Sequence, residues 1–268
     1  MNLNDKVALV TSATRGIGFA SALKLAENGA TVYMGVRRLE ATQEIVDKYP
    51  NLKMIPVFFD AYKVESYKEM VQTVIEKEGK IDILVNNFGT GRPEKDFDLV
   101  NGDEDAFFEI IESNLGSVYR ISKLVVPHMI NNGGGSIVNI SSIGGSVPDI
   151  SRIGYGVSKA AVNNITQQIA MEYARYNIRC NAVLPGMTLT KALKNNMPQE
   201  FLDSFLRHVT LNRAAVPEDI AKAVLYYASD DSSYVTGMIH EVAGGFGLGT
   251  PQYAEMMDMM KGKQKYKK

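Results

Sequence analysis

Residues 6–18 read KVALVTSATRGIG, and this stretch decides the fold of the chain. The continuous apolar run Val7–Val10 is typical of a strand that is buried on both faces. A glycine-containing turn follows it and leads into a helix, which we expect to end near Asn28 because Gly29 suits the position after a helix C-terminus. Glycines at a strand-to-helix turn let the backbone approach a pyrophosphate at the positive end of the helix. The turn therefore indicates nucleotide binding, although any tight turn would also use glycine.

The alternation of a short apolar run with a helical pattern continues along the chain. It predicts an α/β fold, in which helices cover both faces of a doubly wound parallel seven-stranded sheet of the Rossmann type. We expect a single domain over residues 1–250, with a substrate lid at about 187–212. Residues 251–268 form a tail, and its lysine-rich end is expected to be disordered. The further strands are predicted at 31–36, 54–59, 81–85, 136–141, 179–184 and 238–242.

Composition and charge exclude several classes of function. The 268 residues are 45% hydrophobic, which suffices for the core of one large domain, and the net charge of −1 gives no reason to expect a nucleic-acid partner. The single cysteine, Cys180, is expected to be a buried apolar filler, and with three scattered histidines no metal site is predicted. The chain starts directly with a strand signal, and no apolar run approaches the length of a membrane span. We therefore expect a cytoplasmic protein with no membrane partner.

A second stretch, residues 139–159, reads NISSIGGSVPDISRIGYGVSK and indicates chemistry. Tyr155 and Lys159 stand four residues apart at the start of a predicted helix, so their side chains lie on one face. An ammonium beside a phenol favours the phenolate, which makes the tyrosine a usable proton donor and acceptor. Ser142 closes the preceding strand, where its hydroxyl could hold a substrate oxygen. Taken alone, the Tyr-x-x-x-Lys spacing also fits a half-exposed pair on any amphipathic helix.

The residues after the second predicted strand indicate the cofactor. A carboxylate there would accept hydrogen bonds from ribose hydroxyls, as in sites selective for NAD. Here Arg37 and Arg38 follow the strand instead, and Arg15 lies within the glycine-containing turn. Guanidinium groups bind phosphate in bidentate fashion and stack on adenine. The three arginines favour NADP(H), whereas the alternative is a pair of solvated arginines at a strand end.

In their order along the chain, these motifs resemble those of the short-chain dehydrogenase/reductase family, over residues of about 5–250. The resemblance rests on the glycine-containing turn, on Asn86-Asn87-x-Gly89 after the fourth strand, and on the serine, tyrosine and lysine above. It implies an oxidoreductase that transfers a hydride between a nicotinamide cofactor and an alcohol or ketone. Its catalytic residues would be Ser142, Tyr155, Lys159 and Asn114, the last of these supporting a water in a proton relay. Members of the family usually form dimers or tetramers.

The resemblance also implies the binding residues. Asp60 would contact the adenine, although it would equally suit a cap for the next helix. Asn114 lies in the middle of a predicted helix at 104–131, where a surface position is the ordinary alternative. The substrate would contact Ser142, Tyr155 and Gly186. The cofactor would contact Ser12, Thr14, Arg15, Gly16, Ile17, Gly18, Arg37, Arg38, Asp60, Ala61, Asn87, Gly89, Tyr155, Lys159, Thr188 and Thr190.

Several positions depart from the family pattern. Ser12 stands where the first glycine of the turn is usual, and Ala243 where an aspartate is often found. Phe88 replaces an alanine, and we expect its ring to narrow the cofactor cleft or to face the substrate. Gly154 and Gly156 lie in a predicted helix at 152–176, where each costs about 1 kcal/mol relative to alanine. They suggest close packing against substrate, cofactor or a neighbouring subunit.

Four segments narrow the resemblance to one branch of the family. Residues 11–18, 86–96, 147–155 and 249–253 are similar to NADP-dependent hydroxysteroid dehydrogenases of anaerobic gut bacteria. Those enzymes interconvert the 7α-hydroxyl and 7-oxo groups of bile acids, so the resemblance implies a bile-acid substrate and a homotetramer. One alternative is a 3-oxoacyl-carrier-protein reductase or another ketone reductase of the family. The other is a non-catalytic dinucleotide-binding protein, although such a protein would normally have lost Tyr155 or Lys159.

Overall fold

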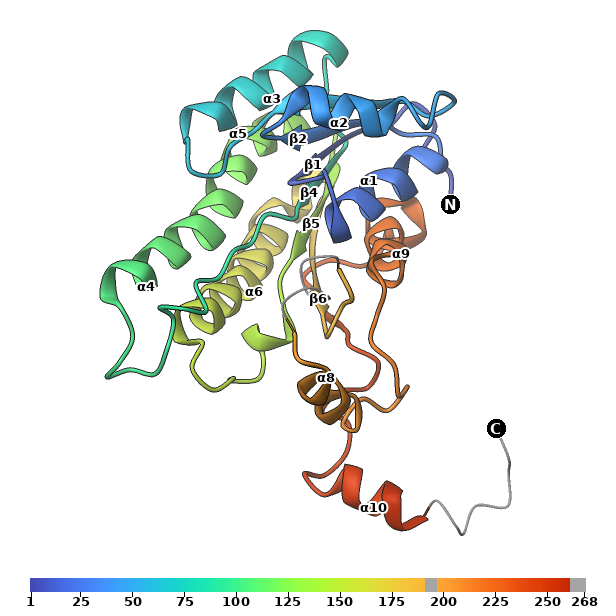
Figure 1. Ribbon diagram of the computed structural model, residues 1–268. Helices are drawn as coiled ribbons and strands as arrows, with labels where there is room; N and C mark the ends of the chain where they lie inside the picture. Colours follow the sequence, from blue (N-terminus) through green and yellow to red (C-terminus); the bar gives the residue numbers. More distant parts are fainter. Residues whose placement is uncertain (191–196, 261–268) are drawn as a thin grey trace.

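Seven parallel strands form one sheet in the computed structural model, which describes residues 1–190 and 197–260 (Figure 1). The order across the sheet is β3-β2-β1-β4-β5-β6-β7, which confirms the predicted doubly wound topology. The order reverses between β1 and β4, and ligands of such sheets bind in the crevice beyond the carboxyl ends of the strands at that point. The strands are β1 (Val7–Thr11), β2 (Thr31–Val36), β3 (Met54–Phe58), β4 (Ile83–Asn86), β5 (Gly135–Ile140), β6 (Ile178–Pro185) and β7 (Ile239–Val242).

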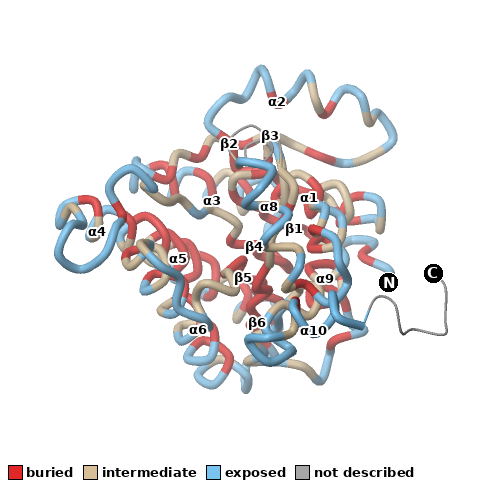
Figure 2. The backbone as a smooth tube through the Cα atoms, turned by 60° about the horizontal axis from the view of Figure 1, so that its bottom comes forward, coloured by how far each residue is buried: buried red, intermediate tan, exposed pale blue. Residues whose placement is uncertain are grey.

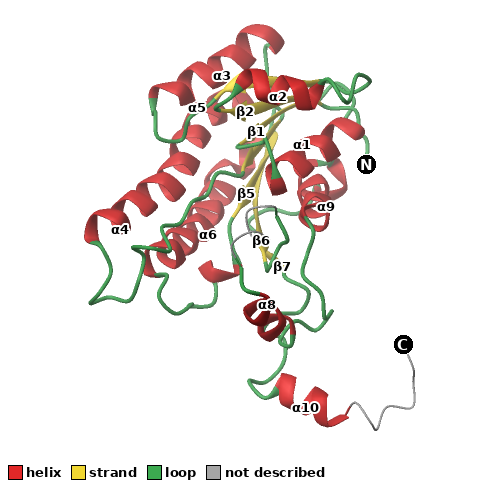
Figure 3. Ribbon diagram, viewed as in Figure 1, coloured by secondary structure: helices red, strands yellow, loops and turns green. Residues whose placement is uncertain are grey.

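Helices cover both faces of this sheet. Figure 3 shows α1, α2 and α9 on one face and α3, α5 and α6 on the other, whereas α8 and α10 lie beyond the carboxyl ends of the strands. No helix in the described ranges is long and apolar enough to cross a membrane. The helices are α1 (Gly16–Glu27), α2 (Leu39–Val46), α3 (Glu65–Glu78), α4 (Glu104–Ile111), α5 (Ser117–Asn131), α6 (Ile153–Tyr173), α8 (Gln199–Leu206), α9 (Pro217–Ala228) and α10 (Tyr253–Met260).

The core lies in two apolar layers, one on each side of the sheet, and the strands run through its centre (Figure 2). Successive residues of β1 enter opposite layers, since Val10 packs with the layer under α1 and α9 and Leu9 with the layer under α3 and α5. Burying a side chain of this size stabilises the fold by roughly 1.5–3 kcal/mol. Burial on both faces explains why the strand is a continuous apolar run. Cys180 lies fully buried in the same core, as predicted.

Two elements differ from the prediction. The helix predicted at 104–131 is divided into α4 and α5 by a π-helical turn, Glu112–Gly116. The predicted tail contains α10, because its Ala-, Glu- and Met-containing sequence has high helix propensity and Arg207 pairs with Asp258 at 2.9 Å. The lysine-rich end predicted to be disordered, 261–268, and residues 191–196 of the predicted lid lie outside the described residues.

Candidate active site

A cavity of about 850 Å³ opens at the carboxyl ends of the strands, beside the point where the strand order reverses. Its walls come from the first turn of α1, the segments after β4, β5 and β6, the first turns of α6, and the region of α8. Segments far apart in the sequence thus meet because the strands that deliver them are parallel and adjacent. The predicted site residues that line the cavity are Ile17, Asn87, Gly89, Ser142, Tyr155, Lys159, Gly186, Thr188 and Thr190.

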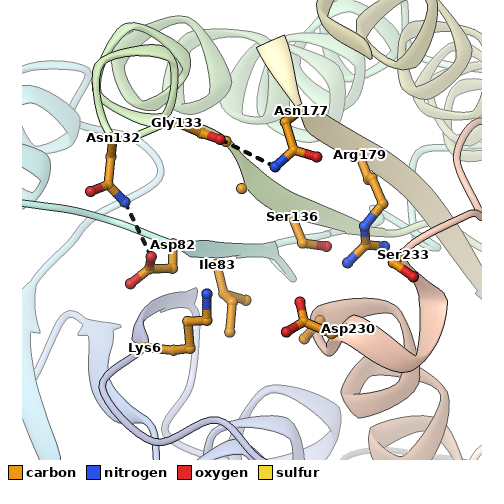
Figure 4. Close-up of a pocket in the computed structure, with 13 residues that line it drawn as sticks. Lys6, Asp82, Ile83, Asn132, Gly133, Ser136, Asn177, Arg179, Asp230 and Ser233 are labelled. Atoms are coloured by element: carbon orange, nitrogen blue, oxygen red, sulfur yellow. Dashed lines mark hydrogen bonds between the residues drawn. The ribbon is translucent and has the colours of Figure 1, made fainter. Parts of the chain in front are cut away.

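A second cavity, of about 250 Å³, lies at the opposite edge of the sheet, where β1, β4, β5 and β6 begin (Figure 4). Its lining is polar and includes Lys6, Asp82, Arg179 and Asp230. Asp82 accepts hydrogen bonds from Val7 N at 2.8 Å and from Asn132 Nδ2 at 3.2 Å, so its carboxylate joins the start of β1 to the end of α5. None of the predicted site residues lies there, and we place the candidate site in the larger cavity.

Tyr155 and Lys159 lie one helical turn apart on α6. Lys159 is only 3% exposed, its Nζ donates a hydrogen bond to Ile140 O at 3.0 Å, and Nζ lies 5.9 Å from the centre of the Tyr155 ring. Burial lowers the pKa of Lys159, and Tyr155 opposes that shift. The alternative interpretation, a half-exposed pair on an amphipathic helix, does not fit this buried lysine. Its ammonium is available to act on the tyrosine and on a bound group.

Glycines leave space around these two side chains. A Cβ on Gly89 would lie 2.9 Å from Lys159 Nζ, and a Cβ on Gly91 would lie 3.8 Å from Tyr155 Cδ2. A Cβ on Gly144 would lie 3.5 Å from Ser142 Oγ and 3.6 Å from Tyr155 Cε1. The side chains of Ser142 and Tyr155 therefore both lie beside Gly144. Gly144 N also donates a hydrogen bond to Ser142 Oγ at 3.1 Å, which fixes the serine.

Asn114 lies in the π-helical turn between α4 and α5 and is fully buried, so the alternative of a surface position is wrong. Its side chain accepts a hydrogen bond from Thr90 N at 2.8 Å and donates to Thr90 O at 2.9 Å. It also donates to Ser158 Oγ at 2.9 Å, and Ser158 donates to Tyr155 O. Asn114 thus joins the segment after β4 to the helix that carries the tyrosine and lysine.

The turn after β1 has the shape that a dinucleotide needs. Gly16 has a φ of +59°, and a Cβ on Gly18 would overlap the carbonyl oxygen of Ser12. Asn87 Nδ2 donates to Thr11 O and Ser12 O, each at 3.2 Å, and holds the turn against the end of β4. Ser12 itself adopts a left-handed φ of 53°, which costs a non-glycine residue roughly 1–2 kcal/mol. Although Ser12 replaces the usual glycine, its backbone keeps the left-handed conformation that glycine favours.

The remaining predicted cofactor residues lie at the same edge of the sheet but outside the cavity wall. Arg15, Arg37 and Arg38 are exposed, and none of them forms an ion pair with a described residue. Asp60 follows β3, and its Oδ1 accepts a hydrogen bond from Tyr62 N at 3.1 Å, so it stabilises a turn instead of capping α3. The other predicted cofactor residues outside the wall are Ser12, Thr14, Gly16, Gly18 and Ala61, and the predicted catalytic residue Asn114 also lies outside it.

The structure corrects the expectations for two departures from the family pattern. Phe88 does not line the cavity and packs edge-on against Phe59 and Tyr62, so the expectation that it faces a substrate there is wrong. Its ring extends the apolar layer under α3. Gly154 packs against α4 of the same chain, where a Cβ would lie 3.3 Å from Ile110 Cδ1. Close packing of that helix position is thus confirmed, but the contact is internal.

The substrate lid predicted at about 187–212 contains part of the apolar wall of the cavity, but sequence reasoning missed the rest of this wall. Phe205 of α8 and Phe246 have parallel rings whose centres are 4.7 Å apart. Arg152 was missed as well, although its guanidinium carbon lies 4.4 Å above the Tyr155 ring. The spacing of these residues in the sequence carries no common period, so no local pattern could have grouped them. The wall comprises Val147, Pro148, Met187, Met197, Phe201, Phe205 and Phe246.

This arrangement suits proton transfer to or from an oxygen on a large apolar molecule. The glycine-containing turn, the helix start beyond it and the crevice at the reversal of strand order fit a dinucleotide. Tyr155 and Ser142 supply hydroxyl groups at the cavity, and Lys159 supplies a nearby cation. These polar side chains and the apolar wall line the same cavity.

Comparisons with known proteins agree with this description. A family model described as enoyl-(acyl carrier protein) reductase matches residues 12–247. A 7α-hydroxysteroid dehydrogenase from Paraclostridium sordellii is 71% identical over 258 residues, which are 95% of this chain and 97% of that protein. Another from Clostridium sardiniense is 59% identical over 94% of this chain and 97% of that protein. A solved structure of a 7α-hydroxysteroid dehydrogenase with NADH and 7-oxo glycochenodeoxycholic acid has a TM-score of 0.86 at 34% identity, covering 91% of this chain and 95% of that one.

Proposed function

Because the chain belongs to the short-chain dehydrogenase/reductase family, we propose that it interconverts the 7α-hydroxyl and 7-oxo groups of bile acids with NADP(H). The observation that carries this proposal is the 71% identity to a 7α-hydroxysteroid dehydrogenase over 95% of the chain. The cavity supports it, because its apolar wall suits the face of a steroid and the hydroxyl groups of Ser142 and Tyr155 suit a reacting oxygen.

The bound nicotinamide would accept or deliver the hydride. Tyr155 takes the proton from the substrate hydroxyl during oxidation and returns it during reduction. Lys159 stabilises the tyrosinate, since a cation in a buried environment acts strongly on a neighbouring anion. Ser142 holds the substrate oxygen with its hydroxyl. Asn114 joins the helix of Tyr155 to the segment after β4, and we assign it the support of the proton relay.

The preference for NADP(H) over NAD(H) is part of this proposal, and three arginines support it. Arg15, Arg37 and Arg38 lie in the turns after β1 and β2, where the adenosine ribose of a dinucleotide is bound in this fold. Their guanidinium groups form no ion pair with a described residue, so they are free to bind a phosphate.

Replacing these arginines by glutamine should weaken binding of NADP(H) selectively. A charge-assisted hydrogen bond contributes about 1.5–3 kcal/mol, so Arg37→Gln or Arg38→Gln should raise the dissociation constant of NADPH roughly 10- to 150-fold if that arginine binds the 2′-phosphate. The dissociation constant of NADH should change less than about threefold. Fluorescence titration with both cofactors measures this, with Arg175→Gln as a control at an exposed arginine far from the site. Equal losses for NADPH and NADH would refute recognition of the 2′-phosphate.

The whole proposal is tested by absorbance of the reduced nicotinamide with purified protein. We expect rapid reduction of NADP by chenodeoxycholate or cholate, which carry 7α-hydroxyls, and none by the 7β epimer of chenodeoxycholate. Absence of turnover with 7α acids, together with reduction of a 3-oxoacyl thioester, would favour the carrier-protein reductase instead. Binding of NADPH without turnover of any substrate would favour the non-catalytic alternative.

A further inference from the structure

The loop between β4 and α4 contacts the helix of Tyr155 through one buried carboxylate. Asp96 is 6% exposed, its Oδ1 accepts a hydrogen bond from Gly154 N at 2.7 Å, and its Oδ2 accepts one from Tyr155 N at 2.9 Å. These two amides belong to the first turn of α6, which begins at Ile153. The residue at the N-cap position, Arg152, supplies no side-chain hydrogen bond to a described group there. Asp96 therefore caps α6 from a distant segment.

The fit between this carboxylate and the helix is close. Amide donors and the positive end of a helix both favour a negative charge at this position. A Cβ on residue 154 would lie 3.2 Å from Asp96 Oδ1 and 3.4 Å from Phe107 Cα, so glycine leaves the space that the carboxylate occupies. This contact gives a physical reason for a glycine within the first turn of the helix.

We propose that Asp96 is a positioning residue for the reaction, because it holds the backbone of Tyr155 itself. The proposal rests on the proposed function in that it takes Tyr155 as the proton-transferring group. The same loop is fixed at its other end, where the backbone of Thr90 exchanges two hydrogen bonds with Asn114. Thr90 and Asp96 also line the cavity. The loop thus joins the substrate side of the cavity to the start of α6 and sets the direction of the tyrosine toward Ser142.

Removing the carboxylate should lower kcat without a matching loss of cofactor binding. A displacement of about 1 Å at a reacting group can reduce the rate roughly 100-fold. We therefore expect kcat of Asp96→Ala to fall at least tenfold, with the dissociation constant of NADPH within about threefold of the wild-type value. The kcat of Asp96→Asn should lie between those of Asp96→Ala and the wild type. The asparagine side chain has one acceptor oxygen, so it can accept only one of the two hydrogen bonds.

Asp103 provides a matched control in the same loop. It caps α4 by accepting a hydrogen bond from Ala106 N at 2.8 Å, and it forms no hydrogen bond or ion pair with a described residue of α6. Asp103→Ala should lower the melting temperature about as much as Asp96→Ala but keep kcat within about twofold. Equal kcat in the two variants would reduce Asp96 to a helix cap with no role in the reaction.

Hydrogen–deuterium exchange gives a readout that needs no substrate. The peptide covering residues 150–158 should exchange faster in Asp96→Ala than in the wild type, and at the wild-type rate in Asp103→Ala. Unchanged exchange in Asp96→Ala would overturn the inference even if bile acids are not substrates. Failure of the proposed function would show differently, as a wild-type protein that turns over no 7α-hydroxy acid while its exchange still depends on Asp96.

Discussion

Tyr155→Phe should abolish turnover while leaving the fold and cofactor binding intact. The substitution removes one hydroxyl group and keeps the ring, the backbone hydrogen bond to Asp96 and the contact with Arg152. General acid–base catalysis contributes roughly 10²- to 10⁴-fold to a rate, and Tyr155 is the group to which we assign the proton transfer at the cavity. We expect kcat for oxidation of a 7α-hydroxy acid to fall at least roughly 1000-fold.

The measurement combines steady-state formation of NADPH with fluorescence titration of the cofactor. The dissociation constant of NADPH should stay within about threefold of the wild-type value, because the phenolic hydroxyl is one of many cofactor contacts. Tyr234→Phe is a suitable control, since this tyrosine is fully exposed and lies far from the cavity. A Tyr155→Phe enzyme that kept more than about a tenth of the wild-type kcat would remove Tyr155 from the proton-transfer step.

The sheet and the location of the site could be predicted from the sequence because both follow from local patterns. Each buried strand is a short apolar run, and parallel pairing brings every strand's carboxyl end to one edge. Motifs found after separate strands, such as Asn87 and Ser142, therefore had to meet. The spacing of Tyr155 and Lys159 depends only on helix geometry, so it was also readable in advance.

The parts that were missed depend on contacts between distant segments. Asp96 stands in a loop with other acidic residues, and only the fold shows that it reaches α6 and that Asp103 reaches α4. Phe88 was expected at the cleft because it replaces the alanine of the family pattern, but it does not line the cavity, whereas its neighbours Asn87 and Gly89 do. The π-helical turn at Asn114 likewise follows from the long-range hydrogen bonds of that side chain with Thr90.

Lys159→Met should have opposite effects on activity and on stability. Turnover should fall at least roughly 100-fold, because the variant lacks the cation that stabilises the tyrosinate. The free energy of unfolding of the cofactor-free protein should rise by roughly 1–3 kcal/mol at neutral pH, because the ammonium is buried and methionine fills a similar volume without charge. This increase already allows for the lost hydrogen bond from Lys159 Nζ to Ile140 O, which contributes about 1 kcal/mol to stability.

The difference in stability should also depend on pH in a defined direction. Burial holds the pKa of Lys159 below its ordinary value of 10.5, so between the two values the unfolded chain binds more protons than the folded protein. As the pH rises through the pKa of Lys159 in the folded protein toward 10.5, the free energy of unfolding of the wild type should therefore increase relative to that of Lys159→Met. The difference in stability between the two proteins should become smaller. Urea unfolding at several pH values measures this, with Lys222→Met on the exposed side of α9 as a control that shows no such trend. A Lys159→Met protein less stable than the wild type at neutral pH would mean that the ammonium stabilises the fold, so that burial is not its dominant energetic effect.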